Sequence, residues 1–353
     1  MKILFVCDTM GSGGAERVIS ILSNSFSYRN HEVSILMLSS KASEPFYNLD
    51  KHIKVEYLKN YQNGKISKLG KVKLLRQIFI QHSPDVVISF LSYVCIYTWA
   101  ALRKTNIPYV VSERNDPSHR GIIKQILLNM AFKKASARVF QTHDALVWYD
   151  KNNKKKSHII YNPVELNYIS KRTVEKKKQI LYVGRFTKQK NCLMLLKAFS
   201  LFSKSHPDYL MKMYGGGNCK ANIEEMILKE NLSDKVFVLN SSKTWQADEF
   251  DSAMFVLPSL YEGMPNVLAE ALCLGIPSVS TDCPIGGPKE LKSIFGDRLI
   301  LVRNNNHKLF ALGMEKALDL PLQESCVPND LLAENIVNKW VSLLESIKDK
   351  NDE

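Results

Sequence analysis

The stretch AMFVLPSLYEGMPNVLAEALCLGIPSVST, residues 253–281, contains a complete strand, turn, helix and second strand. The apolar run AMFVLPS is typical of a buried strand, and Gly263 and Pro265 bracket a turn after it. Pro265 suits the first position of a helix, because its missing N–H costs nothing there. We expect that helix over 265–274 and the second strand over 277–281. This is the repeating unit of a parallel α/β sheet.

The same alternation of short β-branched runs and amphipathic segments extends over the chain. Strands are expected at 2–7, 31–38, 53–58, 85–90, 109–113 and 138–142, and again at 179–184, 209–215, 235–239, 253–259, 277–281 and 298–302. Helices are expected after Gly14 and at 65–81, 119–134, 192–204 and 221–231. The pattern predicts two doubly wound parallel sheets, each in a Rossmann-like domain.

At 353 residues the chain is about twice the usual domain length. Residues 165–178 are rich in Lys and Arg and have no apolar period, so we place the linker there. This predicts an N-terminal domain over 1–165 and a C-terminal domain over 166–330, facing each other across a cleft. The last helical stretch, within 331–353, has no strand after it and can pack back on either domain; we assign it to the first.

Positive charge is concentrated in the first half. Residues 1–170 hold 24 Lys+Arg and 12 Asp+Glu, which gives +12 of the total +13. This half therefore suits an anionic partner, such as nucleic acid, lipid headgroups or a phosphorylated substrate. The seven cysteines have no zinc or redox spacing and indicate a reducing compartment. The apolar start, MKILFVC, is too short for a signal peptide, and residues 86–102 fit a strand and a helix better than a membrane span.

Three groups of residues follow predicted strands, where ligands bind in parallel sheets. The first is the turn Gly11–Gly14, whose glycines let a phosphate or sugar approach a helix start. The second is Gly184-Arg185 with Lys190, two cations that can neutralise a diphosphate leaving group without a metal ion. The third is Glu262 with Glu270, set around a turn and the backbone N–H groups of the following helix.

With these motifs the chain resembles the retaining glycosyltransferases of family four, which have the GT-B architecture. The resemblance covers essentially the whole chain and rests on GGAER, VGRFTKQKN, YGGGN and the pair Glu262 and Glu270. The strings EGMPNVLAEAL and GIPSVSTDCPIGGPKEL are similar to those of bacterial enzymes that build capsule, O-antigen or lipid-linked oligosaccharides.

The resemblance implies a donor, an acceptor and a role for each motif. The donor is a nucleotide diphosphate sugar, preferably UDP-linked, and the transferred group is a hexose or N-acetylhexosamine. Glu262, Arg185 and Lys190 are the implied catalytic residues, and no metal or cofactor is expected. The implied donor-binding set is Gly184, Arg185, Lys190, Gly216, Glu262, Gly263, Met264, Pro265, Asn266, Val267 and Glu270.

The acceptor is expected on the N-terminal domain, through Gly13, Gly14 and the residues after the 109–113 strand. Many relatives carry a histidine there, whereas this chain has Glu113 and Arg114, which become acceptor candidates instead. The segment 65–82 mixes cations with apolar side chains, as suits a membrane interface. It also resembles the basic helix that relatives use for a polyprenyl diphosphate acceptor. Its cations on one face are Lys65, Lys68, Lys73 and Arg76, with Lys71 outside that face.

Together these features predict an enzyme in the cytoplasm, peripheral on the inner face of the cytoplasmic membrane and bound to its anionic surface. One alternative keeps the fold but changes the reaction to nucleotide-sugar epimerisation or hydrolysis. The other is a basic nucleic-acid-binding protein. It is disfavoured because the cations are not interleaved with aromatic residues as in nucleic-acid modules.

Overall fold

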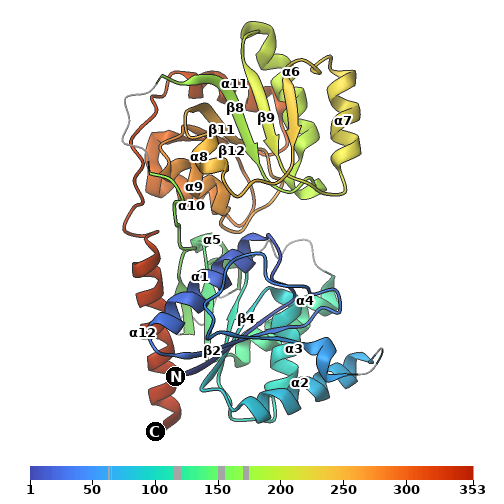
Figure 1. Ribbon diagram of the computed structural model, residues 1–353, viewed down its shortest axis with the longest axis vertical. Coiled ribbons are helices and arrows are strands. Elements are labelled where there is room, and N and C mark those ends of the chain that lie inside the picture. Colours follow the sequence, from blue (N-terminus) through green and yellow to red (C-terminus); the bar gives the residue numbers. More distant parts are fainter. Residues whose placement is uncertain (63, 65, 115–120, 150–155, 170–174, 353) are drawn as a thin grey trace. The chain divides into compact units, whose positions relative to one another are not determined.

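The computed structural model describes residues 1–62, 64, 66–114, 121–149, 156–169 and 175–352. The chain divides into two compact units (Figure 1). The first comprises residues 1–163 and 333–353, and the second comprises residues 164–332. This boundary lies two residues from the one expected at 165.

The first unit contains a parallel sheet in the order β3-β2-β1-β4-β5-β6-β7. Its central strands are almost fully buried, which is why they are mainly Val, Ile, Leu and Phe without alternation. The strands are β1 (Lys2–Cys7), β2 (Glu32–Met37), β3 (Lys54–Tyr57), β4 (Val86–Phe90), β5 (Tyr109–Ser112), β6 (Ala137–Phe140) and β7 (Ser157–Ile159). The helices between them are α1 (Gly14–Tyr28), α2 (Lys68–His82), α3 (Ser92–Leu102), α4 (Ile122–Lys134) and α5 (His143–Tyr149).

The second unit repeats this architecture in the order β10-β9-β8-β11-β12-β13. The strands are β8 (Lys177–Val183), β9 (Leu210–Tyr214), β10 (Val236–Leu239), β11 (Ser252–Leu257), β12 (Ser278–Asp282) and β13 (Leu299–Arg303). Its helices are α6 (Cys192–Ser205), α7 (Lys220–Lys229), α8 (Trp245–Asp248), α9 (Asn266–Cys273), α10 (Gly287–Phe295) and α11 (His307–Leu318). Both orders reverse direction beside the first strand of the unit, between β1 and β4 and between β8 and β11.

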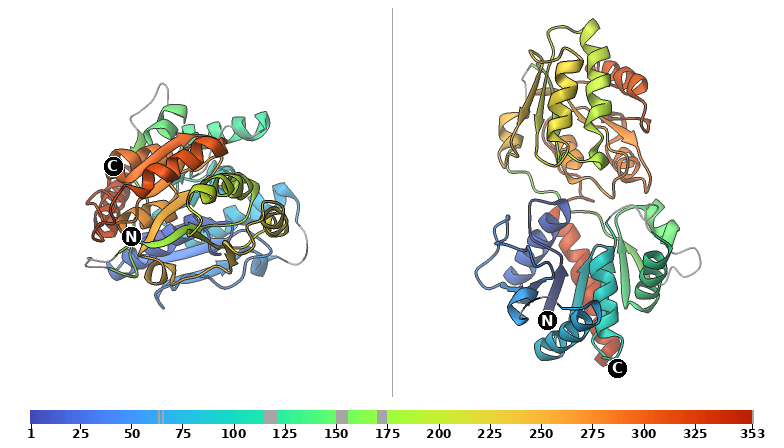
Figure 2. Two further views of the ribbon diagram at one scale, coloured as in Figure 1. Left: turned by 90° about the horizontal axis from the view of Figure 1, so that it is seen from above. Right: turned by 90° about the vertical axis from the view of Figure 1, so that its right-hand side faces the viewer.

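The helix α12 (Ala333–Asp352) belongs to the first unit, along which it runs in Figures 1 and 2. Its residues Ile336, Val337 and Trp340 are buried in the core that β1, β2 and β4 form. The Trp340 ring lies 6.1 Å from the ring of Phe90. The first unit therefore takes part of its core from the distant end of the chain.

Most predicted strands and helices lie within a few residues of the observed ones. The strand β7 was not predicted, because its three residues are only half-buried and lack an apolar run. The predicted linker extends too far, since Lys177 and Lys178 already belong to β8. The stretch 86–102 is a strand and a helix, as expected. None of the helices within the described residues combines the length and apolar character that a membrane span requires.

We expect Trp340→Ala to lower the free energy of unfolding of the first unit by about 3–5 kcal/mol, because it empties a fully buried indole site. Denaturant unfolding followed by circular dichroism measures this change. The matched control is Trp148→Ala, since Trp148 is half exposed and its loss is expected to change stability little. Equal effects of the two substitutions would contradict the docking of α12 in this core.

Candidate active site

Two loops of the second unit follow β8 and β11, the strands that flank the reversal of strand order. The first loop carries Gly184, Arg185 and the 3₁₀ turn Lys188–Lys190, and the second carries residues 258–265. Open α/β sheets bind ligands at this reversal, because the loops diverge there and leave a crevice at the carboxyl ends of the strands. The fold thus brings together two motifs about 70 residues apart in the sequence.

Lys190 and Glu262 form a buried ion pair between these two loops. The Nζ atom of Lys190 donates to Oε1 of Glu262 at 2.5 Å, and the Ser259 hydroxyl donates to the same oxygen at 2.6 Å. Both charged side chains are about nine-tenths buried. Two charge-assisted hydrogen bonds to one oxygen fix the position of the carboxylate. Lys190 is thereby held at the carboxyl end of β8, where its charge can also face an anionic ligand.

Backbone contacts hold the two loops together beside this pair. The Leu260 N–H donates to the Gln189 carbonyl at 2.8 Å, and the Gln189 side-chain amide donates to the Tyr261 carbonyl at 2.9 Å. The amide of Asn304 adds a bond to the Leu260 carbonyl at 2.7 Å. The positions of Lys190 and Glu262 therefore rest on a hydrogen-bonded frame, because each loop satisfies polar groups of the other.

Glu270 lies on α9 and is also buried. Its Oε2 accepts a hydrogen bond from the Gln246 amide at 3.1 Å, and the Gln246 oxygen accepts from the Asn167 N–H at 2.7 Å. Gln246 therefore orients Glu270, a role that sequence reasoning missed. Pro265 is the residue that caps α9, one position before the helix begins. The positive end of the α9 dipole lies at this turn and suits an anion or sugar hydroxyls.

Glycines make the close packing of these loops possible. A Cβ atom on Gly287, at the start of α10, would lie 1.4 Å from the Gly263 carbonyl oxygen. A Cβ atom on Gly215 would lie 2.0 Å from the Gly184 carbonyl oxygen, whereas one on Gly216 would meet nothing within 4 Å. Gly287 and Gly215 thus serve packing, and Gly216 faces open space that a ligand can occupy.

The predicted donor-binding residues differ in exposure. Arg185 is exposed at the end of β8, Asn266 and Val267 are half-buried, and Met264 is buried. Cys283 lies close to Glu262, where burial and the nearby carboxylate raise the pKa of its thiol. A neutral thiol adds no charge to the site. Among the described residues, no group of three or more His, Cys, Asp or Glu side chains is arranged to hold a metal ion.

In the first unit, the glycine turn after β1 is partly covered by its own chain. The Tyr47 hydroxyl donates to the Ser12 carbonyl at 3.3 Å. The carboxylate of Glu16 lies over Gly13, 2.2 Å from where a Cβ would stand. An acidic side chain in the first turn of α1 already complements the helix dipole. The turn therefore suits neutral sugar hydroxyls better than a phosphate.

Glu113 and Arg114 follow β5 and are both buried. The Arg114 guanidinium lies 3.8 Å from the Phe90 ring centroid and donates to the Asn162 side chain. Burial lowers the pKa of Arg114, and the Glu113 carboxylate opposes that shift. Their burial makes both residues part of the packing at this edge. Lys190, Glu262 and Glu270 are just as buried, so burial alone does not remove Glu113 and Arg114 from the acceptor candidates.

The cations of the basic helix α2 are arranged differently from the sequence-based expectation. Arg76 donates to the carbonyls of Ala100 and Ala101 at 3.3 and 2.9 Å, so it joins α2 to the end of α3 instead of facing a ligand. Lys71, expected to lie apart from the basic face, points to the carboxyl edge of the sheet. Its Nζ donates to the Leu38 carbonyl at 3.1 Å and to the Tyr93 hydroxyl at 2.9 Å. Burial lowers the pKa of Lys71.

Two of the other predicted cations on this segment, Lys68 and Lys73, are exposed on α2. Lys65 lies outside the described residues. The helical spacing thus placed Lys68, Lys73 and Arg76 on one arc, but contact with α3 separates Arg76 from the other two.

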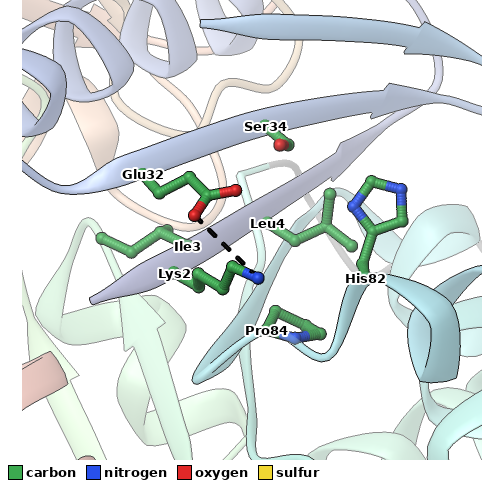
Figure 3. A pocket seen from close by; sticks show the side chains of 7 residues that line it. All are labelled: Lys2, Ile3, Leu4, Glu32, Ser34, His82 and Pro84. Atoms are coloured by element: carbon green, nitrogen blue, oxygen red, sulfur yellow. Dashed lines mark ion pairs between the residues drawn. The ribbon is translucent and has the colours of Figure 1, made fainter.

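Figure 3 shows a pocket at the opposite edge of the same sheet, where β1 and β2 begin. Its volume of about 10 Å³ holds at most one water molecule. It is therefore too small for a substrate. The residues that line it are Lys2, Ile3, Leu4, Glu32, Ser34, His82 and Pro84.

Two Rossmann-like units, with cations and carboxylates at the strand-order reversal of the second, define the GT-B class. Comparison with known proteins agrees. The profile of the family described as "Glycosyl transferases group 1" matches residues 166–330, and that of "Glycosyltransferase Family 4" matches residues 12–168. The protein belongs to the family 4 type of GT-B glycosyltransferases.

Individual relatives cover nearly the whole chain. A Campylobacter jejuni protein named GalNAc-alpha-(1->4)-GalNAc-alpha-(1->3)-diNAcBac-PP-undecaprenol alpha-1,4-N-acetyl-D-galactosaminyltransferase is 26% identical over 99% of each chain. The amylovoran biosynthesis glycosyltransferase AmsD of Erwinia amylovora is 27% identical over 82% of this chain and 84% of its own. The crystal structure of Anabaena Alr3699/HepE in complex with UDP and glucose has the same fold, with a TM-score of 0.77 and 17% identity over 98% of this chain and 100% of that one.

The contact between Gly287 and the Gly263 carbonyl leads to a prediction. Gly287→Ala forces α10 away from the turn, so we expect it to lower the free energy of unfolding by about 1–3 kcal/mol. We expect it to weaken nucleotide binding as well, because the turn is displaced. Thermal unfolding and calorimetric titration with UDP measure the two effects. Gly121→Ala is the control, because an added Cβ there meets nothing within 4 Å. Unchanged UDP affinity in the Gly287 variant would show that the turn does not contact the donor.

Proposed function

We propose that this protein transfers a hexose or N-acetylhexosamine from a UDP-linked donor to a glycan carried on a polyprenyl diphosphate. The reaction proceeds with retention of anomeric configuration and without a catalytic metal ion. The enzyme acts at the anionic inner face of the cytoplasmic membrane, in the assembly of a surface polysaccharide or oligosaccharide. The observation that carries the proposal is the buried contact of Lys190 with Glu262, beside exposed Arg185, at the strand-order reversal of the second unit.

Each donor-side residue has a role that follows from its chemistry. Arg185 and Lys190 bind the diphosphate and neutralise the charge that develops on it as the bond to the sugar C1 breaks. Glu262, fixed by Lys190 and Ser259, accepts hydrogen bonds from hydroxyls of the transferred sugar, and backbone N–H groups at the start of α9 donate to oxygens of the same sugar. Glu270, oriented by Gln246, accepts from the ribose hydroxyls.

Bond formation needs no covalent intermediate on the protein. The acceptor hydroxyl attacks C1 from the face that the diphosphate leaves, and its proton passes to the departing phosphate oxygen. A new C1–O bond replaces the old one, and configuration is retained. The protein contributes orientation and a fixed electrostatic field, which are the main sources of catalysis in such transfers.

Acceptor chemistry is supported by the names of relatives. The Campylobacter jejuni protein is named for a substrate linked to undecaprenol through PP, and AmsD is named for amylovoran biosynthesis. In this chain, Lys71, Lys68 and Lys73 at the carboxyl edge of the first sheet supply cations for an acceptor diphosphate. Tyr93 and Tyr97 flank the Lys71 ammonium, about 5 Å from each ring centroid, and offer ring faces to a sugar.

On the donor side, we expect Arg185→Ala and Lys190→Ala each to weaken UDP binding about tenfold to a hundredfold, because each removes a charged hydrogen bond to the diphosphate. The loss is smaller for UMP, which lacks the second phosphate. Isothermal titration with both nucleotides measures the difference. Lys188→Ala is the control, since Lys188 is exposed on the same 3₁₀ turn.

A second variant distinguishes two reasons why Lys190→Ala could weaken UDP binding: loss of a contact with the diphosphate, and destabilisation of the buried Glu262 carboxylate. Lys190→Ala alone leaves the Glu262 carboxylate buried without its cation, whereas Lys190→Met combined with Glu262→Gln does not. If the double variant recovers stability but not UDP affinity, Lys190 contacts the diphosphate. Wild-type UDP affinity in folded Arg185 and Lys190 variants would refute the donor site.

On the acceptor side, Lys71→Ala and the double variant Lys68→Ala/Lys73→Ala are expected to raise KM for a polyprenyl-diphosphate acceptor about tenfold, with UDP affinity unchanged. Arg76→Ala is expected to lower the stability of the first unit instead, because its contacts are with Ala100 and Ala101. Steady-state kinetics and thermal unfolding distinguish the two effects. Lys104→Ala is the control, because Lys104 is exposed after α3, away from the carboxyl edge.

The reaction type has its own test. Incubation with UDP-sugars, with and without lipid-linked acceptor and in the presence of a chelator, shows whether conversion needs an acceptor or a metal ion. Proton NMR of the product gives the anomeric configuration of the new bond. Conversion without acceptor would establish an epimerase or hydrolase instead, and loss of activity with the chelator would overturn the metal-independent mechanism.

A further inference from the structure

The helix α4 has apolar residues on two opposite faces. Leu128, Ala131 and Phe132 are buried against the first unit. The opposite face is apolar too, although it lies in solvent: Ile122 is 80% exposed, Ile123 77% and Ile126 53%. At about 100° per residue, the exposed apolar positions fall within an arc of about 140°. We call them the α4 face, and they are Ile122, Ile123, Ile126, Leu127 and Met130.

The α4 face continues along one edge of the sheet. The helices α2, α3 and α4 follow one another as neighbours (Figure 1), and each begins at the carboxyl edge because each follows a parallel strand. An exposed apolar or aromatic side chain stands near the first residue of each helix. These side chains are Leu69 on α2, Tyr93 on α3 and Ile122 on α4. This is the edge that holds the proposed acceptor cations. An apolar surface in this place is thus next to the acceptor's lipid diphosphate.

The charge of these three helices is entirely positive. Their sequences contain no Asp or Glu; α2 and α4 carry Lys and Arg side chains, and α3 carries no charge. Lys133 and Lys134 lie in the last turn of α4, within the exposed apolar arc and near its two edges, and Lys124 lies near the start of the helix, outside that arc. A second exposed apolar pair, Val147 and Trp148, follows on α5, whose Tyr149 stacks on Phe132 of α4 at 4.8 Å.

We propose that the α4 face is the surface through which this enzyme docks on an anionic lipid bilayer. Resting on the proposed function, this assigns the membrane contact to α4, whereas sequence analysis favoured α2. Exposed isoleucines enter the acyl region, the lysines bind lipid phosphates, and Trp148 lies at the headgroup level. A bilayer, rather than a protein, fits because the surface combines apolar residues on three neighbouring helices with charges that are all positive on α2 and α4. Docking there holds the carboxyl edge of the first sheet at the headgroups, where the acceptor diphosphate lies.

The test is flotation of the full chain with vesicles of phosphatidylethanolamine and phosphatidylglycerol. Ile122→Ser/Ile123→Ser/Ile126→Ser is expected to reduce the bound fraction at least about tenfold. The matched control is Leu228→Ser/Phe237→Ser/Leu312→Ser, three exposed apolar residues of the second unit, which should bind as wild type does. Because all six side chains are exposed, thermal unfolding should stay unchanged. Vesicles of phosphatidylcholine alone are expected to bind the wild type weakly.

A second measurement follows Trp148 directly. Trp99, Trp245 and Trp340 are buried, so emission that moves to shorter wavelength on addition of vesicles reports Trp148, and Trp148→Phe should abolish the shift. Equal vesicle binding by wild type and the α4 triple variant would overturn the proposal. So would conversion of a wild-type oligomer to monomer by that variant, since a second copy would then cover the face. Transfer to a water-soluble acceptor should be unaffected by the variant; absence of any transfer by wild type would count against the proposed function alone.

Discussion

The buried contact between Lys190 and Glu262 is the constraint on which the candidate active site depends. Two charges removed from water are stable only when further hydrogen bonds satisfy them, and the Ser259 hydroxyl supplies one. Such a pair does little for stability compared with an apolar substitute. Its value is positional, because it fixes a carboxylate and an ammonium at the point where the strand order reverses. The hydrogen bonds of Gln189 with Leu260 and Tyr261 keep the two loops together, and close glycine contacts pack each loop against a neighbouring segment.

The two units share a topology but present different chemistry at their carboxyl edges. In the second unit the edge is rigid, with buried carboxylates held by Lys190 and by Gln246. In the first unit, Glu113 and Arg114 are buried at this edge, a half-buried Lys71 lies between two tyrosines, and exposed apolar side chains stand at the helix starts. One edge is thus built to hold a small charged ligand, and the other to meet a large amphiphilic one.

Sequence alone predicted the sheets well, because buried parallel strands are continuous apolar runs and Pro265 marks the start of α9. It brought the motifs of Lys190 and Glu262 to one site, since both follow strands of the same sheet. The sequence could not predict side-chain contacts that form only in the folded chain. Spacing along α2 showed which cations share an arc but not that α3 would engage Arg76. Gln246 and Gly287 carry no local signal either, because their partners lie some twenty residues away in sequence.

The course of the chain has a consequence for biosynthesis. Residues 164–332 contain every strand of the second unit, so that unit can fold as soon as they leave the ribosome. The first unit, although translated earlier, lacks Ile336, Val337 and Trp340 of its core until α12 emerges. Its apolar groove beside β1 and β4 stays uncovered for the whole time that the second unit is being made. The half of the enzyme that begins first is therefore the half that finishes last.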